Sequence, residues 1–332
     1  MFLDRISFHT SIAVMATMNA FFFNYESLPM QISHHLSQAV RLVNEQVKSL
    51  EFTDSTLSVV NFLIVQGLVQ EDLERAAIHR EGLQRIVEVL GGLSKLKLHP
   101  TLLLKIHKTD IDLSLHDGSP THFYRDKMAE IKTTLRERGY VLADKSVPFT
   151  TSLSTTAPEL AGILQDTICI TALFNDKDVD FKVDPHTLAE ITVSIGYRLL
   201  KFRTLNDTRQ DNALEAAFHI GIATFLSTLY IQFGNRRFLK YHLVGTRLCE
   251  VIENGLGKEN ASVMLWLVFL GGISVLSNVD RDWLTRTVHV VTQALRITTW
   301  EEIQDHLLGY PWVSELHDKP GMAVWKSIAD LS

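Results

Sequence analysis

The sequence predicts an all-α fold, a single large multi-helix domain of two packed lobes built as an array of helical hairpins. Three observations carry this prediction. Apolar residues recur at steps of three and four along most of the chain, helix-capping signals bound these stretches, and strand signals are weak. The best strand candidate, around Tyr140-Val141-Leu142, has no partner segment that alternates convincingly.

The stretch from Gln70 to Leu90 shows the helical period most clearly. Its apolar residues share one helix face, and its charged residues occupy the other faces. Gly91-Gly92 follows directly, and glycine tolerates the left-handed backbone that often ends a helix. We therefore expect the helix to stop there, with Leu93 folded back as the apolar residue beyond the cap.

Prolines and capping side chains mark further helix starts. Pro100 and Pro158 stand at the first positions of two predicted helices, and Asp184 provides a capping side chain just before Pro185. The segment Thr299-Trp300-Glu301-Glu302 is a capping box, because Thr299 can accept from the third amide while Glu302 reaches back. The helices expected after Pro100 and Pro158 span Leu102–Leu115 and Leu160–Phe174.

The stretch from Gly139 to Pro158 is predicted to be a loop. It contains Lys145-Ser146-Val147-Pro148 and a cluster of Ser and Thr from Thr150 to Thr156. It is the one plausible hinge, so the boundary between the two lobes is expected near 139–158. Apolar stripes on both sides predict that the lobes pack together within one domain spanning 1–332.

The composition is that of an ordinary globular protein, with 332 residues of which 46% are hydrophobic and 21% charged. The net charge of −6 offers no basic face for a phosphate backbone, and the densest basic stretch, Arg236-Arg237 with Lys240, is interpreted as a solvated helix start. Cys169 and Cys249 stand among apolar neighbours and are interpreted as buried reduced thiols. We therefore expect no direct nucleic acid binding by this chain.

Two uncharged stretches raise the question of a membrane segment. Ile6–Asn24 is followed by no clear signal-peptide cleavage site. In the second stretch, Ala261–Val279, the continuous apolar part Val263–Leu276 contains Gly271-Gly272 and is shorter than the ~20 residues that a spanning helix needs. A buried core helix is therefore expected there, and no membrane association.

The motifs of common enzyme classes are missing from the sequence, which has no phosphate-binding loop, nucleophile elbow or zinc helix. One alternative remains. His79 followed by His116-Asp117 resembles the opening of the all-helical HD-type metal-dependent phosphohydrolases, in which a bound metal activates water. That family's metal pair lies within a helix, whereas Asp117 is followed at once by the turn signal Gly118-Ser119-Pro120. The leading expectation is a chain with no catalytic residues, metal or cofactor.

Two further groups of polar residues are weaker candidates. His107, Asp110 and Asp112 fall on one predicted helix, but only His107 and Asp110 share a face, so a metal site would lack ligands. His34-His35 point in different directions on a helix. Both groups are expected to be exposed or partly buried polar side chains.

Aromatic side chains are more suggestive than titratable ones. A pocket lined by them could hold an apolar small molecule, whereas the simpler interpretation is that each one fills the core. The aromatic residues concerned are Phe21-Phe22-Phe23, Phe218, Phe225, Tyr230, Trp266, Phe269, Trp283, Trp300, Trp312 and Trp325.

Several of these residues recur in an order that resembles the regulatory domain of fungal-specific transcription factors. The resemblance covers about residues 9–325. Its most specific part is similar to that family's His…Gly-Leu…Gly-Gly-Leu segment and to the Pro-x-x-Phe sequence that ends the following helix. The C-terminal third of the chain is similar to the C-terminal part of the family's domain. The residues that carry it are His79, Gly82, Leu83, Gly91, Gly92, Leu93, Pro120, Phe123, Trp266, Gly271, Gly272, Trp283, Trp300, Pro311, Trp312 and Trp325.

This resemblance implies a non-enzymatic transcription regulator that works through protein partners or self-association, with an apolar small molecule as a further candidate ligand. It also implies a nuclear location; without it, the expectation is cytoplasmic. The family usually carries a binuclear zinc cluster of six closely spaced cysteines, which this sequence lacks. We therefore expect either a stand-alone regulatory domain or a shortened form of a longer factor. Most of the matched residues are expected to be scaffold.

Overall fold

The computed structural model describes residues 5–23, 30–49, 52–93, 99–142, 153–178, 181–207, 212–229, 232–233, 236–237, 239–276 and 281–329. Within those ranges all the long elements are helices, and the strands are two short ones, β1 (Gln232–Phe233) and β2 (Arg236–Arg237), which pair antiparallel. The predicted all-α fold class is confirmed. Residues 140–142 form no strand. Of the loop predicted over 139–158, residues 139–142 have an irregular backbone as expected, whereas 153–156 are helical.

The chain forms two compact units. Unit 1 comprises Met1–Leu113 with Ile231–Lys240, and unit 2 comprises Ser114–Tyr230 with Tyr241–Ser332. The division falls inside the continuous helix α5 (Pro100–Asp117), where no Pro, Gly or loop composition marks it. It therefore lies upstream of the boundary that the sequence suggested near 139–158, of which 143–152 lie outside the described residues.

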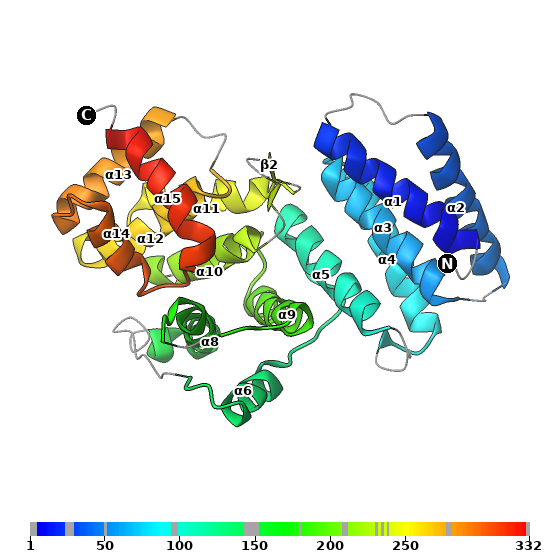
Figure 1. Ribbon diagram of the computed structural model, residues 1–332, viewed down its shortest axis with the longest axis horizontal. Coiled ribbons are helices and arrows are strands. Elements are labelled where there is room, and N and C mark those ends of the chain that lie inside the picture. The colour runs from blue at the N-terminus through cyan, green and yellow to red at the C-terminus, as the bar shows by residue number, and fades with distance from the viewer. Residues whose placement is uncertain are drawn as a thin grey trace. The chain divides into compact units, whose positions relative to one another are not determined.

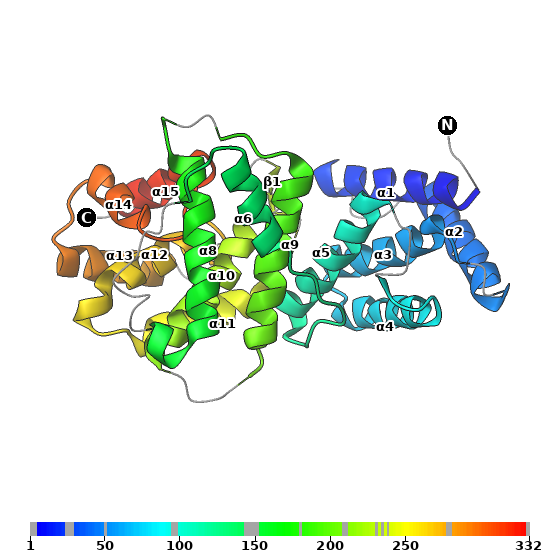
Figure 2. The same cartoon turned by 90° about the horizontal axis from the view of Figure 1, so that it is seen from below.

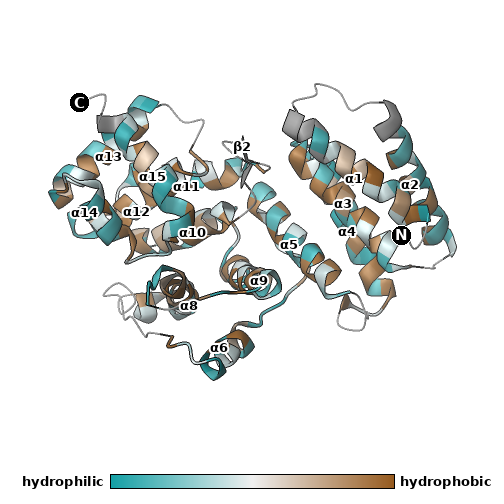
Figure 3. Ribbon diagram, in the orientation of Figure 1, coloured by the Kyte–Doolittle hydropathy of each residue, from teal (hydrophilic) through white to brown (hydrophobic). Residues whose placement is uncertain are grey.

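Unit 1 consists of helical hairpins. Helix α1 (Arg5–Phe23) packs on α2 (Met30–Ser49), α3 (Asp54–Val69) packs on α4 (Leu73–Val89), and α1 also contacts α3 (Figure 1). These helices carry brown apolar and teal polar positions in alternation (Figure 3), as expected when a helix buries one face and exposes another. The predicted array of hairpins is thus present in this unit.

Helix α4 ends as its sequence predicts. The Asp72 carboxylate caps its start by accepting from the Arg75 amide, and Gly91 and Gly92 have φ values of 87° and 99°. The Gly92 amide donates to the Val87 carbonyl at 2.8 Å, which satisfies one of the last carbonyls of the helix. The helix begins three residues later than the predicted Gln70, because the Asp72 cap sets the start.

Ion pairs on α5 correct one expectation. His107, Asp110 and Asp112 are each only 3% exposed, although they were expected to be exposed or partly buried. Asp110 lies 3.8 Å from the Arg80 guanidinium, and Asp112 lies 3.6 Å from the Lys108 ammonium. A buried cation therefore accompanies Asp110 into the interior, and Arg80 lies on another helix, so the spacing of residues along α5 does not reveal the pair.

Unit 2 is built around two apolar helices, α10 (Ala213–Thr228) and α12 (Ala261–Gly272), which contact each other. Helices α8, α9 and α10 lie side by side (Figure 2). The remaining helices of the unit are α6 (Met128–Glu137), α8 (Pro158–Asn175), α9 (Pro185–Phe202), α11 (His242–Asn254), the 3-10 turn η2 (Lys258–Asn260), α13 (Arg281–Leu295), α14 (Trp300–Leu307) and α15 (Ser314–Ala329).

The predicted helix starts of unit 2 are confirmed. Asp184 accepts from the amides of His186 and Thr187 at the start of α9, with Pro185 at the first helical position. Thr299 and Glu302 form the capping box of α14. Helix α12 is buried, as expected for Val263–Leu276, and no helix in the described part of the chain is long and apolar enough to cross a membrane.

The core of unit 2 holds most of the tryptophans singled out in the sequence. Trp266 is fully buried, donates from Nε1 to the Pro311 carbonyl at 3.1 Å, and stacks on Tyr310 with ring centroids 5.4 Å apart. A side chain on Gly221 would collide with its indole. Trp312, also fully buried, donates to the Asp318 carboxylate at 2.8 Å. Both indoles are thus packed and hydrogen-bonded within the core of unit 2.

Two expectations about single residues were wrong. Arg236-Arg237 forms β2 and not a helix start, and α11 begins only at His242. Cys249 is half-buried, whereas Cys169 is buried as expected. The arginines form a strand because they pair with β1. Cys249 is only half-buried because it lies on the outer side of an amphipathic helix. The side chains of Phe21-Phe22-Phe23 and residue Tyr230 lie outside the described residues.

Candidate functional site

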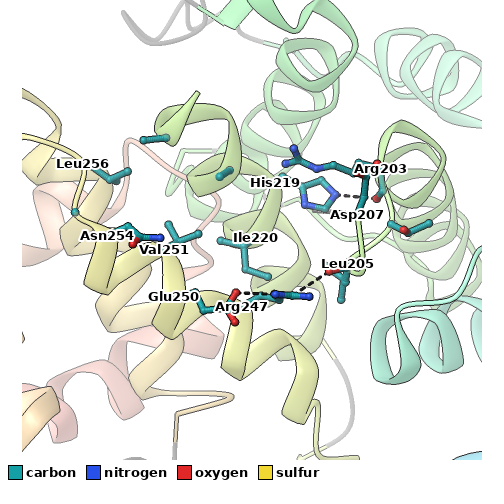
Figure 4. A pocket seen from close by; sticks show the side chains of 14 residues that line it. Arg203, Leu205, Asp207, His219, Ile220, Arg247, Glu250, Val251, Asn254 and Leu256 are labelled. Carbon is teal, nitrogen blue, oxygen red and sulfur yellow. Dashed lines mark hydrogen bonds and ion pairs between the residues drawn. The ribbon is translucent and has the colours of Figure 1, made fainter. Parts of the chain in front are cut away.

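A cavity of about 500 Å³ opens in unit 2, lined by the segment after α9, the first half of α10 and the second half of α11 (Figure 4). Its volume is in the range of small-molecule sites. The lining combines apolar, cationic and anionic side chains. They are Arg203, Thr204, Leu205, Asp207, Ala213, Ala216, His219, Ile220, Arg247, Glu250, Val251, Asn254, Gly255 and Leu256.

Local sequence signals place the walls of this cavity. Helix α9 stops at Phe202, and Arg203 has an extended backbone that carries the chain away from the helix axis. Asn212 caps α10 by accepting from the Leu214 amide at 3.0 Å. Gly255 ends α11 with φ 73°, a conformation that glycine adopts at little cost. Three helix ends therefore meet around one space.

The inner end of the cavity carries one cation and one neutral imidazole. The Arg203 side chain is only 5% exposed, and its Nη1 lies 3.6 Å from Glu215 Oε1. His219 lies beside Arg203 (Figure 4) and donates from Nε2 to the Arg203 carbonyl at 3.0 Å. Burial, together with the nearby Arg203 charge, lowers the pKa of His219 to about 4. At neutral pH the guanidinium is therefore the charge at this end.

The outer part of the cavity is held by Arg247. Its Nε donates to the Leu205 carbonyl at 3.0 Å, and its Nη1 donates to Glu250 Oε2 at 2.8 Å. The first bond ties the segment after α9 to α11, and the second lies within α11. Between the two arginines, the side chains of Ile220 and Val251 supply an apolar wall (Figure 4).

The segment after α9 also holds the end of α5. The Asn206 side chain donates to the Asp117 carbonyl at 2.8 Å, and it lies so close to Gly118 that a Cβ there would collide with it. Gly118 has φ 71°, so a larger residue would also be strained. The segment from Arg203 to Asp207 thus contributes four residues to the cavity lining and, through Asn206, holds the end of α5.

We expect His219 to make the stability of the protein fall in acid. Its pKa is depressed in the folded state, so the unfolded chain binds the proton more tightly. The contribution is fully present above about pH 6.5 and is lost as the pH falls toward 4, amounting to about 3 kcal/mol. Urea unfolding between pH 7 and 4 measures it. The His219→Gln variant, which keeps an N–H donor, should lose this part of the pH dependence; an unchanged slope would contradict the assignment.

The residues of the phosphohydrolase alternative have other surroundings. His79 is half-buried on α4, and burial lowers its pKa. The His116 ring contacts the Tyr241 ring with centroids 4.4 Å apart, and the Asp117 carboxylate accepts from the amide and hydroxyl of Ser119. In the described part of the chain, no three His, Cys, Asp or Glu side chains are grouped to hold a metal ion.

The histidine pair of unit 1 is exposed and partly buried, as expected. His35 turns toward α1, where its Nδ1 lies 2.8 Å from Nδ1 of His9, while the adjacent His34 is exposed. Burial and the His35 ring lower the pKa of His9. The two neighbouring histidines point in different directions, as expected.

The family-like residues mostly lie away from the cavity. Trp283 lines a separate apolar groove of about 420 Å³ between α11, α12 and α13, with Met264 and Val291. Gly271 packs against Leu248 and Leu276, as close helix packing requires. Trp266 and Trp312 fill the core. Arg203, His219, Arg247 and Glu250 were not predicted as site residues. One signal was available: His219 is the only histidine of α10 and stands between the apolar Phe218 and Ile220.

No family model, curated protein or solved structure matches the chain. The residues quoted from the sequence therefore remain the basis of the resemblance to fungal transcription regulators.

Proposed function

We propose that this protein is the effector domain of a transcription regulator, and that it acts in the nucleus through protein partners rather than by catalysis or by binding DNA itself. In this proposal a small molecule in the unit 2 cavity biases the conformation that partners recognise. A ligand shifts such an equilibrium only by its differential affinity for the two states. The ordered set of motif residues from His79 to Trp325 supports the family assignment.

The proposal that a small molecule changes the conformation is supported by the cavity in unit 2. It is bounded by ends of three helices, and the segment from Arg203 to Asp207 contributes several of its lining residues. The same segment holds the Asp117 carbonyl through Asn206. A ligand that moves this segment would therefore also move the end of α5, which gives binding a structural consequence.

A tethering experiment tests the proposed function. The full chain is fused to an unrelated DNA-binding domain and directed to a reporter gene in yeast. We expect reporter output to differ from that of the DNA-binding domain alone, because the effector domain brings its partners to the promoter. Equal outputs at equal protein levels would contradict the proposal. A mobility-shift assay on the unfused chain should show no salt-sensitive complex with DNA.

A further inference from the structure

We propose that the apolar groove between α11, α12 and α13 binds an uncharged aromatic molecule of about two fused rings, which lies against the indole of Trp283. This groove is distinct from the cavity beside Arg203, and Gly255 at the end of α11 is the one residue that lines both. Binding in the groove is independent of the proposed function and can be measured without a transcriptional readout.

The groove has a buried apolar floor that three helices provide. Its floor residues, each less than a tenth exposed, are Ile252, Ala261, Met264 and Val291. Trp283 and Thr287, one turn apart on α13, are half-buried and line the same groove. A ligand that covers this apolar surface gains about 25 cal/mol per Å² of apolar area removed from water.

The charged side chains of the groove lie at its rim. Glu253, Lys258 and Arg286 are exposed, whereas the floor consists of uncharged residues. The rim carries both signs of charge, and water and salt screen exposed charges, so the rim selects neither an anion nor a cation. A charged group placed on the floor would lose its hydration without gaining a partner there. The groove therefore favours an uncharged ligand.

The indole of Trp283 favours an aromatic ligand. Trp266, Trp300 and Trp312 each contact another ring, whereas Trp283 has no ring partner among the described residues. Aromatic pairs are more stable than their buried area alone explains. The thioether of Met264, which lines the same groove, is a further group that contacts aromatic rings favourably. An aromatic ligand should therefore bind more tightly than a saturated one of the same size.

The size of the groove favours a small molecule over a protein. A cavity of about 150 Å³ holds a benzene ring, so the groove of about 420 Å³ accommodates two fused rings. A stable protein interface buries about 800 Å² on each partner. In the described elements α11, η2, α12 and α13, Val290 is the one exposed large apolar side chain. The groove therefore offers far less apolar surface than a second copy of the chain would need.

Saturation-transfer NMR on the full chain at pH 7 tests the ligand class with four probes of similar size. They are 2-naphthol, its saturated analogue decahydro-2-naphthol, the anion 2-naphthoate and the cation 2-naphthylmethylamine. We expect 2-naphthol to bind at least about threefold more tightly than decahydro-2-naphthol, and at least about tenfold more tightly than either charged probe. Equal or tighter binding of the saturated analogue would overturn the role of Trp283. Equal binding of a charged probe would overturn the selection of an uncharged ligand, and no binding of 2-naphthol at millimolar concentration would contradict the site itself.

Two substitutions on α13 locate the binding. Thr287→Phe fills the groove and should weaken the binding of 2-naphthol at least about tenfold. Thr285→Phe is the matched control, because Thr285 is also half-buried and its hydroxyl also donates to the carbonyl four residues earlier, but it does not line the groove. It should leave binding unchanged. A folded Thr287→Phe variant that binds 2-naphthol as tightly as the natural chain contradicts the proposed site.

Trp283→Leu separates the aromatic contact from the burial of apolar surface, and it decides the matter if Thr287→Phe fails to fold. Leucine keeps an apolar side chain but has no ring. The variant should therefore bind 2-naphthol about threefold less tightly and decahydro-2-naphthol almost as tightly as the natural chain does. An equal loss for both probes, or no loss for 2-naphthol, would overturn the proposed contact with the indole.

A second copy of the chain is the competing occupant of the groove. Val290→Glu places a charge on its exposed rim and should leave the oligomeric state unchanged in sedimentation velocity. If the natural chain self-associates and Val290→Glu dissociates it, the groove is covered by a second copy and the small-molecule site is wrong.

Discussion

The Trp266→Ala variant should be less stable than the natural protein by about 4 kcal/mol, because it removes the largest side chain at the centre of unit 2. The indole is fully buried, stacks on Tyr310 and fits against Gly221. Its Nε1 donor is also lost, which leaves the Pro311 carbonyl without that partner. Urea unfolding followed by circular dichroism measures the loss.

Trp283→Ala is the matched control. It removes the same side chain from a half-buried position on α13, in the separate apolar groove. Less apolar surface returns to water there, so the loss of stability should be clearly smaller. If the two variants lose equal stability, Trp266 does not have the central packing role described.

The second large effect is expected for Arg80→Met in unit 1. The carboxylate of Asp110 is 1% exposed and lies 3.8 Å from the Arg80 guanidinium. Removing the guanidinium leaves the buried Asp110 carboxylate without this nearby positive charge. The free energy of unfolding should therefore fall by about 3–5 kcal/mol. Thermal or urea unfolding measures it.

Two further variants separate charge from packing at this pair. The double variant Arg80→Met with Asp110→Asn removes both charges, so it should recover part of the stability that Arg80→Met loses. Arg85→Met, on the exposed side of α4, should have an effect within about 0.5 kcal/mol. A double variant as unstable as Arg80→Met alone would show that the guanidinium acts through packing and not through charge.

The sequence predicted the helices well because their signals are local. Asp184 before Pro185, the Thr299–Glu302 capping box and the Gly91-Gly92 stop act within one helical turn, so each can be recognised without knowledge of distant residues. The same signals fix helix ends only approximately, as the start of α4 at Leu73 instead of Gln70 shows.

Features that depend on distant partners could not be predicted in this way. Burial of Asp110 requires Arg80, which lies on another helix. The boundary between the units falls inside α5, where the local sequence is continuous helix. No spacing rule connects Asp110 with Arg80, and none marks the division inside α5.

The cavity was also beyond the reach of sequence patterns. Arg203 follows the end of α9 and Arg247 lies on α11, and nothing in the sequence places them around one cavity. Tertiary packing brings the end of α9, the start of α10 and the end of α11 together. Of the aromatic residues that suggested a ligand site, Trp266 and Trp312 fill the core and Trp283 lines a separate apolar groove.

The most direct test of the central claim, that the cavity controls the activity of an effector domain, compares two phenylalanine substitutions in the tethered reporter assay. Ala216→Phe fills the cavity, and Ala129→Phe adds the same bulk on the exposed surface of α6, away from it. Across a set of carbon and nitrogen sources, the output of Ala129→Phe should follow that of the natural chain, whereas the output of Ala216→Phe should stay constant where the natural chain responds. A folded Ala216→Phe variant whose output matches the natural chain in every medium would contradict the account.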